Sequence, residues 1–297
     1  MSIDFHQKAF ADEENVPFRA AILSSGQSSI SLLALLCPAV QAWKALAKAV
    51  GCSNRETQLQ CLREAPWQNL MKAMRQSTLK RLWRDGRVIK VPLLVGTTVE
   101  EGRGLMIQEV DMTEFLEAYF KSGLVPADVR DTIVSVYEAD PRLETDFDIA
   151  AAIFTDYLWQ CPRGLPAELA TPTGSPVWQY QLNASITDLL PAEYAWLGRF
   201  HGSEAWLLFS EPEIIMAQGS PRLLTLYETM RGAIGQFARA PGDGPGWPAV
   251  GAPEDVAMWG GVVDERREGS TPVNRTLVDA RCGLYTQLYR AIESVVG

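Results

Sequence analysis

The chain has 297 residues, of which 47% are hydrophobic and 21% are charged, values typical of a globular protein with a packed core. Its net charge of −9 argues against nucleic acid as a partner, because phosphate binding needs clustered Lys and Arg. The basic stretch at residues 72–87 is interleaved with Leu and Trp, and we interpret it as a solvated helix face.

No targeting or membrane-spanning segment is predicted. Residues 1–20 are polar and mixed in charge, unlike a signal peptide. The most apolar stretch, residues 30–50, is interrupted by Pro38, Lys44 and Lys48, which favours a buried helix over a membrane span.

Three short apolar runs predict buried strands, and long helical stretches separate them. The strands are expected at residues 19–24 (RAAILS), 91–97 (VPLLVGT) and 177–182 (VWQYQL). This alternation indicates an α/β fold with a parallel sheet. Because no stretch resembles a linker, we predict that residues 1–297 form a single domain.

Four helices are predicted from capping signals and helical periodicity. Asp111 with Glu114 gives a capping-box pattern that opens a helix through residue 120. Pro126 opens a second helix through residue 137. Amphipathic patterns predict two more, at residues 146–159 and 221–240.

Polar side chains follow the second and third predicted strands. Glu100 and Glu101 come directly after the second strand, and His201 follows the third. In parallel sheets, catalytic and ligand-binding residues commonly lie just past the carboxyl ends of the strands. His6, the only other histidine, lies in a polar segment and is expected to be solvated. A carboxylate followed by a histidine matches the acid–base half of a hydrolase triad in its chain order.

The five cysteines do not form a metal-site pattern, and we predict no metal and no cofactor. Cys52 and Cys61 could close a small loop that contributes roughly 2–3 kcal/mol in an oxidising compartment. The alternative, buried free thiols in a reducing compartment, stays open at this point.

Three segments together resemble the C-terminal part of type-B carboxylesterases, the cholinesterase-like serine esterases. They are FRAAILSSG at residues 18–26, VPLLVGTTVEEG at 91–102 and GRFHGSE at 198–204. The resemblance covers nearly the whole chain. It implies that Glu101 is the acid of a triad, that His201 is the general base and that Glu204 is a buried carboxylate supporting them.

The resemblance also carries structural expectations. The fold implied is the C-terminal part of an α/β-hydrolase fold, a mostly parallel sheet with flanking helices. Cys52 and Cys61 match a disulfide loop of this family, and the segments around Cys161 and Cys282 match those that carry another bridge.

The nucleophile motif of the family is missing from the sequence. No serine has glycine both two positions before and two positions after it, and the Gly-rich oxyanion motif is absent as well. We therefore expect the chain to begin inside or just after the nucleophile helix, with the strand at residues 19–24 left as an unpaired edge.

Three functional interpretations remain open. The first is a carboxylic ester hydrolase, inactive alone, whose missing half supplies the serine and whose substrate is a small-molecule ester. The second is a non-catalytic, cholinesterase-like binding or adhesion module. The third is a degraded esterase fragment without a stable fold.

Several secondary features leave the compartment and the oligomeric state open. Asn183 and Asn274 lie in sequons and are candidate glycosylation sites, and secretion is common in the family. Four aromatic residues could line a substrate gorge, although their spacing favours core packing: Trp159, Trp178, Tyr180 and Phe200.

Overall fold

The computed structural model describes residues 18–26, 47–48, 50–52, 54, 57–66, 90–123, 125–261, 269–286 and 288–289. The chain separates into two compact units. One unit comprises Pro17–Gln27 and Lys90–Tyr285, and the other comprises Met1–Val16, Ser28–Ile89 and Thr286–Gly297. The single domain predicted for residues 1–297 stays a prediction. His6, Cys37, the basic stretch and most of the apolar stretch lie outside the described residues.

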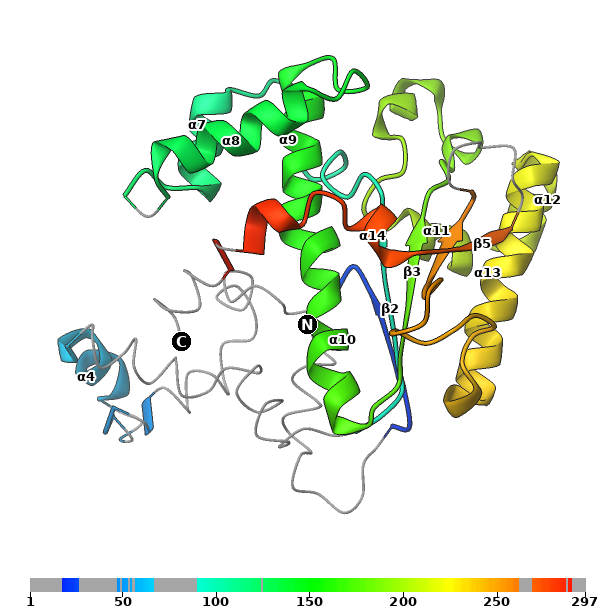
Figure 1. Cartoon of the computed structure of the whole chain (residues 1–297), viewed down its shortest axis with the longest axis horizontal. Helices are drawn as coiled ribbons and strands as arrows, with labels where there is room; N and C mark the ends of the chain where they lie inside the picture. Colours follow the sequence, from blue (N-terminus) through cyan, green and yellow to red (C-terminus); the bar gives the residue numbers. More distant parts are fainter. Residues whose placement is uncertain are drawn as a thin grey trace. The chain divides into compact units, whose positions relative to one another are not determined.

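A five-stranded sheet forms the centre of the larger unit, in the order β1-β2-β3-β4-β5 (Figure 1). Its strands are β1 (Ala21–Ser24), β2 (Leu93–Thr98), β3 (Val177–Leu182), β4 (Val256–Trp259) and β5 (Ser270–Val273). The first four strands run parallel and β5 is antiparallel to β4. The predicted α/β class with a mostly parallel sheet is therefore confirmed.

The three predicted strands are present, whereas β4 and β5 were not predicted. β1 and β2 each begin two residues later than expected. β4 follows a Gly/Pro-rich loop and has only four residues, too few for a clear pattern. β5 contains Pro272 and is largely exposed, and proline in a run argues for an edge position.

One face of the sheet packs against α13 (Pro221–Arg239). Trp178 and Tyr180 point to this face from β3, and Tyr180 stacks on Trp259 with ring centroids 4.1 Å apart. A Cβ at Gly96 would lie 2.1 Å from the Tyr180 ring, so only glycine fits beside it. Helix α13 contributes side chains at helical spacing: Leu223, Leu226, Tyr227, Met230 and Phe237.

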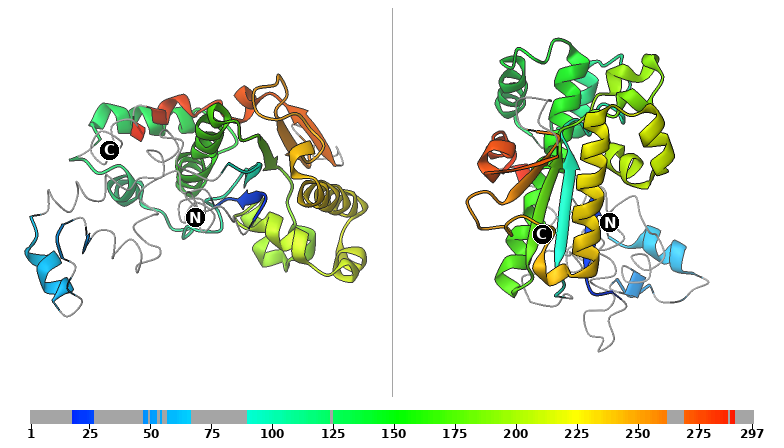
Figure 2. Two further views of the ribbon diagram at one scale, coloured as in Figure 1. Left: turned by 90° about the horizontal axis from the view of Figure 1, so that it is seen from below. Right: turned by 90° about the vertical axis from the view of Figure 1, so that its right-hand side faces the viewer.

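The opposite face is covered by one long helical run, which Figure 2 shows across the sheet from α13. It consists of α9 (Asp146–Thr155), a π-helical turn η1 (Asp156–Gln160), a 3₁₀ turn η2 (Cys161–Arg163) and α10 (Gly164–Ala170). The helix predicted at residues 146–159 therefore continues further, and its period changes within it. The prediction missed the π-turn because periodicity alone does not reveal one extra residue in a turn.

The described residues form further helices in both units. The α-helices are α4 (Gln58–Glu64) in the smaller unit and, in the larger unit, α7 (Met112–Tyr119), α8 (Ala127–Glu138), α11 (Ser203–Phe209), α12 (Pro212–Gln218) and α14 (Arg275–Val278). The further 3₁₀ turns are η3 (Thr171–Thr173), η4 (Thr187–Leu189), η5 (Ala192–Leu197) and η6 (Pro241–Asp243). Asp111 caps α7 as predicted, accepting from the N–H groups of Thr113 and Glu114. Within the described residues, no helix has the length and apolar character that crossing a membrane requires.

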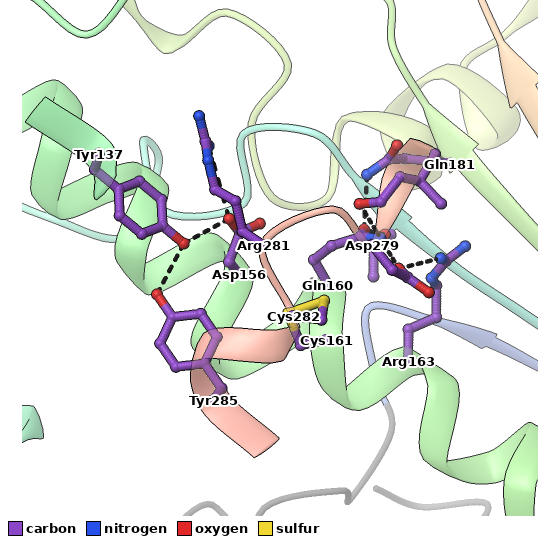
Figure 3. The surroundings of a disulfide bond; sticks show 12 residues. Tyr137, Asp156, Gln160, Cys161, Arg163, Gln181, Asp279, Arg281, Cys282 and Tyr285 are labelled. Atoms are coloured by element: carbon purple, nitrogen blue, oxygen red, sulfur yellow. Dashed lines mark hydrogen bonds and ion pairs between the residues drawn. A yellow bond between two sulfur atoms is a disulfide. The ribbon is translucent and has the colours of Figure 1, made fainter. Parts of the chain in front are cut away.

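Both predicted disulfides are present. Cys52–Cys61 lies in the smaller unit, and Cys161–Cys282 joins the long helical run to the segment after α14 (Figure 3). Polar contacts reinforce the second bridge on both sides. Asp279 accepts hydrogen bonds from Gln160 (2.7 Å) and Arg163 (2.8 Å), and Tyr137 shares a hydrogen bond of 2.8 Å with Tyr285.

The two disulfides should differ in their contribution to stability because they close loops of different length. Cys161–Cys282 spans 121 positions, whereas Cys52–Cys61 spans 9. On the chain-entropy account, the double variant Cys161→Ala/Cys282→Ala should lose about 4–5 kcal/mol of unfolding free energy, and Cys52→Ala/Cys61→Ala about 2–3 kcal/mol. Urea unfolding followed by circular dichroism measures both. Equal losses would contradict the loop-length argument.

Candidate active site

Glu101 lies directly after β2 at the carboxyl end of the sheet and is fully buried. The chain turns sharply there, so that the backbone N–H of Thr98 donates to Oε1 of Glu101 at 2.7 Å. Glycine is needed at the next position, because a Cβ on Gly102 would lie 2.3 Å from the carbonyl oxygen of Ala151. The end of β2 and the turn that follows it therefore hold this carboxylate, and contacts from other elements add to this.

His201 comes from the loop between β3 and α11 and meets Glu101 directly. Its Nδ1 lies 2.6 Å from Oε2 of Glu101, and its side chain is 33% exposed whereas that of Glu101 is 0% exposed. The hydrogen bond with Glu101 raises the pKa of His201, although partial burial of the ring acts in the opposite direction. The structure thus brings together the two residues that the sequence singled out.

The loops that carry these two residues are joined by Glu100 and Arg199. Oε2 of Glu100 accepts from the backbone N–H of Arg199 (2.8 Å) and from its Nε (2.9 Å). In return, the N–H of Glu100 donates to the carbonyl oxygen of Arg199 at 3.2 Å. Gly198, with a φ of +58°, leaves room for this pair, since a Cβ there would lie 2.2 Å from Glu100 Oε2. This clamp fixes the separation of Glu101 and His201.

Ser25 is a site residue that the sequence did not single out. It follows β1, and its hydroxyl donates to Oε1 of Glu101 and, more weakly at 3.4 Å, to Glu204. Its φ of +47° is the only positive value at a non-glycine residue in the described part of the chain. Strained backbone of this kind often marks functional sites. The available signal was a Ser-Gly pair directly after a strand that ends at the same sheet edge.

Glu204 lies beside the pair, on the first turn of α11, and is 1% exposed. Burial, followed by the nearby charge of Glu101, raises its pKa to about 7. Its Oε2 atom is buried without a hydrogen-bond partner, which suits a carboxyl group that is protonated near neutral pH. The carboxyl group of Glu204 therefore loses its proton near neutral pH, and its charge then acts on His201.

The four candidate gorge aromatics divide between core and site. Trp178 and Tyr180 are buried in the core beneath α13, as their spacing favoured. Trp159 instead packs against His201, with ring centroids 5.5 Å apart and planes inclined by 51°. Phe200 is partly buried beside Gly104.

Both sequon asparagines use their side-chain amides in hydrogen bonds within the protein. Asn183 donates through Nδ2 to the carbonyl oxygen of Gly261 and accepts from Arg199. Asn274 donates to the carbonyl oxygen of Pro253 and caps α14 through Oδ1. Their glycosylation stays a prediction. Over the described residues, no three His, Cys, Asp or Glu side chains are arranged to hold a metal ion.

Two solved esterase structures are similar to this fold. EstA of Aspergillus niger matches with a TM-score of 0.60 and 17% sequence identity over 98% of this chain and 62% of that protein. PNB esterase matches with a TM-score of 0.55 and 19% identity over 90% of this chain and 58% of that protein. The chain therefore spans about three fifths of the length of these esterases. No protein-family model matches the sequence, and no curated protein matches it either.

These similarities confirm, at the level of structure, the resemblance to type-B carboxylesterases predicted from the sequence. At such low identity they establish the fold, which corresponds to part of an esterase α/β-hydrolase structure.

The raised pKa of Glu204 should make stability depend on pH. A carboxyl group with a higher pKa in the folded state binds more protons there, so stability falls as pH rises from about 4.5 to about 7. The raised pKa of His201 acts in the same direction at higher pH. Glu204→Gln removes the first contribution. From pH 4.5 to pH 8, the unfolding free energy of wild type should therefore fall by about 1–3 kcal/mol more than that of the variant.

Urea unfolding at the two pH values measures this difference, with the exposed Glu193→Gln as the matched control. If Glu204→Gln and wild type show the same pH dependence, the assigned protonation of Glu204 is wrong.

Proposed function

We propose that Glu101 and His201 form the acid–base half of a carboxylic ester hydrolase, whose nucleophile is a serine in a Gly-x-Ser-x-Gly turn outside this sequence. The observation that carries the proposal is the 2.6 Å contact between Nδ1 of His201 and the fully buried carboxylate of Glu101. A partly exposed imidazole oriented by a buried acid is the arrangement that serine hydrolases use.

The geometry supports a definite division of roles. Donation from Nδ1–H to Glu101 selects the tautomer in which Nε2 is unprotonated. Nε2 can then accept the proton of an attacking serine hydroxyl, and Glu101 stabilises the imidazolium that results. The same nitrogen returns the proton to the leaving alcohol, and the cycle repeats with water to release the acid.

The sheet offers a place for the missing nucleophile. Ser25, Glu101 and His201 all follow the carboxyl ends of three neighbouring parallel strands, so the site lies where α/β proteins commonly act. β1 is the outermost strand of the described sheet. A further parallel strand paired with β1 would end at the same edge and would bring a strand-to-helix turn to His201.

We expect the chain alone to have little esterase activity. Loss of the serine costs on the order of a millionfold in turnover in a triad enzyme, and loss of an oxyanion donor about 3–4 kcal/mol more. The substrate class follows from the chemistry of the pair and from the two similar esterases, and it is a small-molecule carboxylic ester.

A non-catalytic binding module is the second candidate, because the sequence contains no nucleophile turn. A binding surface would have no need of the buried Glu101–His201 contact, which is why we rank the hydrolase first. The third interpretation is a degraded chain without a stable fold, and it predicts that thermal unfolding shows no cooperative transition.

The experiment maps the 5′ end of the transcript and assays both the chain and any longer product on p-nitrophenyl acetate. A product with an upstream Gly-x-Ser-x-Gly segment should hydrolyse the ester. His201→Gln should lower its kcat by about 10⁴–10⁶-fold and Glu101→Gln by about 10⁴-fold.

His6→Gln, which changes the only other histidine, is the control and should leave kcat unchanged. A longer product that hydrolyses the ester equally well after His201→Gln would overturn the proposal. A transcript without an upstream nucleophile segment would favour the binding module.

A further inference from the structure

The π-turn η1 interrupts the long helical run at the level of the active site. Its defining bond runs from the N–H of Cys161 to the carbonyl oxygen of Asp156, five positions earlier. Such turns insert one extra residue into an α-helix and are frequently found at functional sites. Here the extra residue falls between α9, which lies beside the Glu101 loop, and α10, which lies on β3.

The π-turn allows consecutive side chains to be buried against different partners. Tyr157, Leu158, Trp159 and Gln160 are all between 2% and 7% exposed, more consecutive buried positions than one face of a regular helix provides. Gln160 accepts hydrogen bonds from the sheet side chains Thr97 (2.9 Å) and Gln181 (2.6 Å). The residue before it, Trp159, packs against His201. Adjacent residues of one helix therefore contact the sheet, through Gln160, and the imidazole, through Trp159.

Trp159 is itself held firmly. Its ring packs edge to face on Phe154 from the preceding turn, with centroids 5.0 Å apart. Hydrogen bonds anchor the neighbouring Gln160 on two strands, and the disulfide anchors Cys161 directly after it. A side chain that packs on Phe154 and is followed directly by two anchored residues can fix the orientation of a ring that it contacts.

The imidazole of His201 then has two kinds of neighbour. Glu101 and Glu204 are the titratable groups that act on it electrostatically, and Ser25 contacts both carboxyl groups. Trp159 supplies an apolar aromatic surface against the ring. An aromatic ring of this kind attracts an imidazolium more than a neutral imidazole, because its electron-rich face favours positive charge.

We infer that Trp159 is a positioning residue for His201, and that the π-turn η1 is the feature of the fold that delivers it. The inference rests on the proposed function for the reaction that His201 performs. It adds that the imidazole is oriented from two directions, by Glu101 at Nδ1 and by the indole of Trp159 against the ring.

The test is an NMR titration of the 297-residue chain. Because the chain has only two histidines, His6→Gln leaves a single imidazole signal set, that of His201. In this background, Trp159→Phe keeps an aromatic face, whereas Trp159→Leu keeps apolar bulk without one. Trp159→Leu should lower the pKa of His201 by about 0.4–0.7 units, and Trp159→Phe should shift it by less than about 0.2 units.

The sign of the shift separates positioning from mere loss of packing. Removing Trp159 also lets water reach the ring, and since burial lowers the pKa of His201, greater hydration alone would raise it. A rise, or equal shifts in the Leu and Phe variants, would overturn the inference. Phe237→Leu, a buried exchange on α13, is the matched control and should leave the titration unchanged. If Trp159→Leu does not fold, Trp159→Met replaces it, because methionine fills irregular space.

This readout needs no nucleophile, so it stands apart from the proposed hydrolysis. A lowered pKa together with an inactive longer product would sink the esterase proposal and leave the role of Trp159 in place. An active longer product with an unchanged pKa in Trp159→Leu would do the reverse.

Discussion

The buried carboxylate of Glu101 is the constraint around which this site is built. An ionised carboxylate removed from water costs several kcal/mol unless hydrogen-bond donors surround it. Three donors do so here: the N–H of Thr98 at the end of β2, the hydroxyl of Ser25 after β1 and Nδ1 of His201 in the loop after β3. Because the donors come from the ends of three neighbouring strands, the order and register of the sheet are requirements of the site as much as of the core.

The two faces of the sheet serve this site in different ways. The α13 face is apolar and packs aromatic rings such as Tyr180 and Trp259 against a long amphipathic helix. The opposite face carries a polar layer in which Gln160 joins two strands to the C-terminal segment. Buried polar networks of this kind specify a unique arrangement when their members are paired. Because Gln160 belongs to the π-turn, these hydrogen bonds fix the position of the turn relative to the sheet. They thereby also fix the position of the adjacent Trp159 beside His201.

The pair of Glu101 and His201 could be found from the sequence because both signals are local. Each residue follows a predicted strand, and each lies in a short segment that resembles a known esterase motif. Ser25 and Trp159 could not be found in the same way. The role of Ser25 depends on a positive φ and on contacts with residues 76 and 179 positions away. The sequence indicates only a gorge or core aromatic at Trp159, since nothing in the local pattern distinguishes a π-turn from a regular helix.

The sequence by itself determined the α/β class, three of the five strands, both disulfides and the two residues of the acid–base contact. The fold class and the strands follow from hydrophobic periodicity and flanking polar residues, which act over a few neighbouring positions. The disulfide pairings and the roles of Glu101 and His201 follow instead from the resemblance of short segments to those of type-B carboxylesterases. Only the tertiary structure decided the two short strands β4 and β5, the clamp between Glu100 and Arg199, and the raised pKa of Glu204. Those depend on which distant residues share a buried space, and the free energies of burial and of charge interaction are set there and not by sequence neighbours.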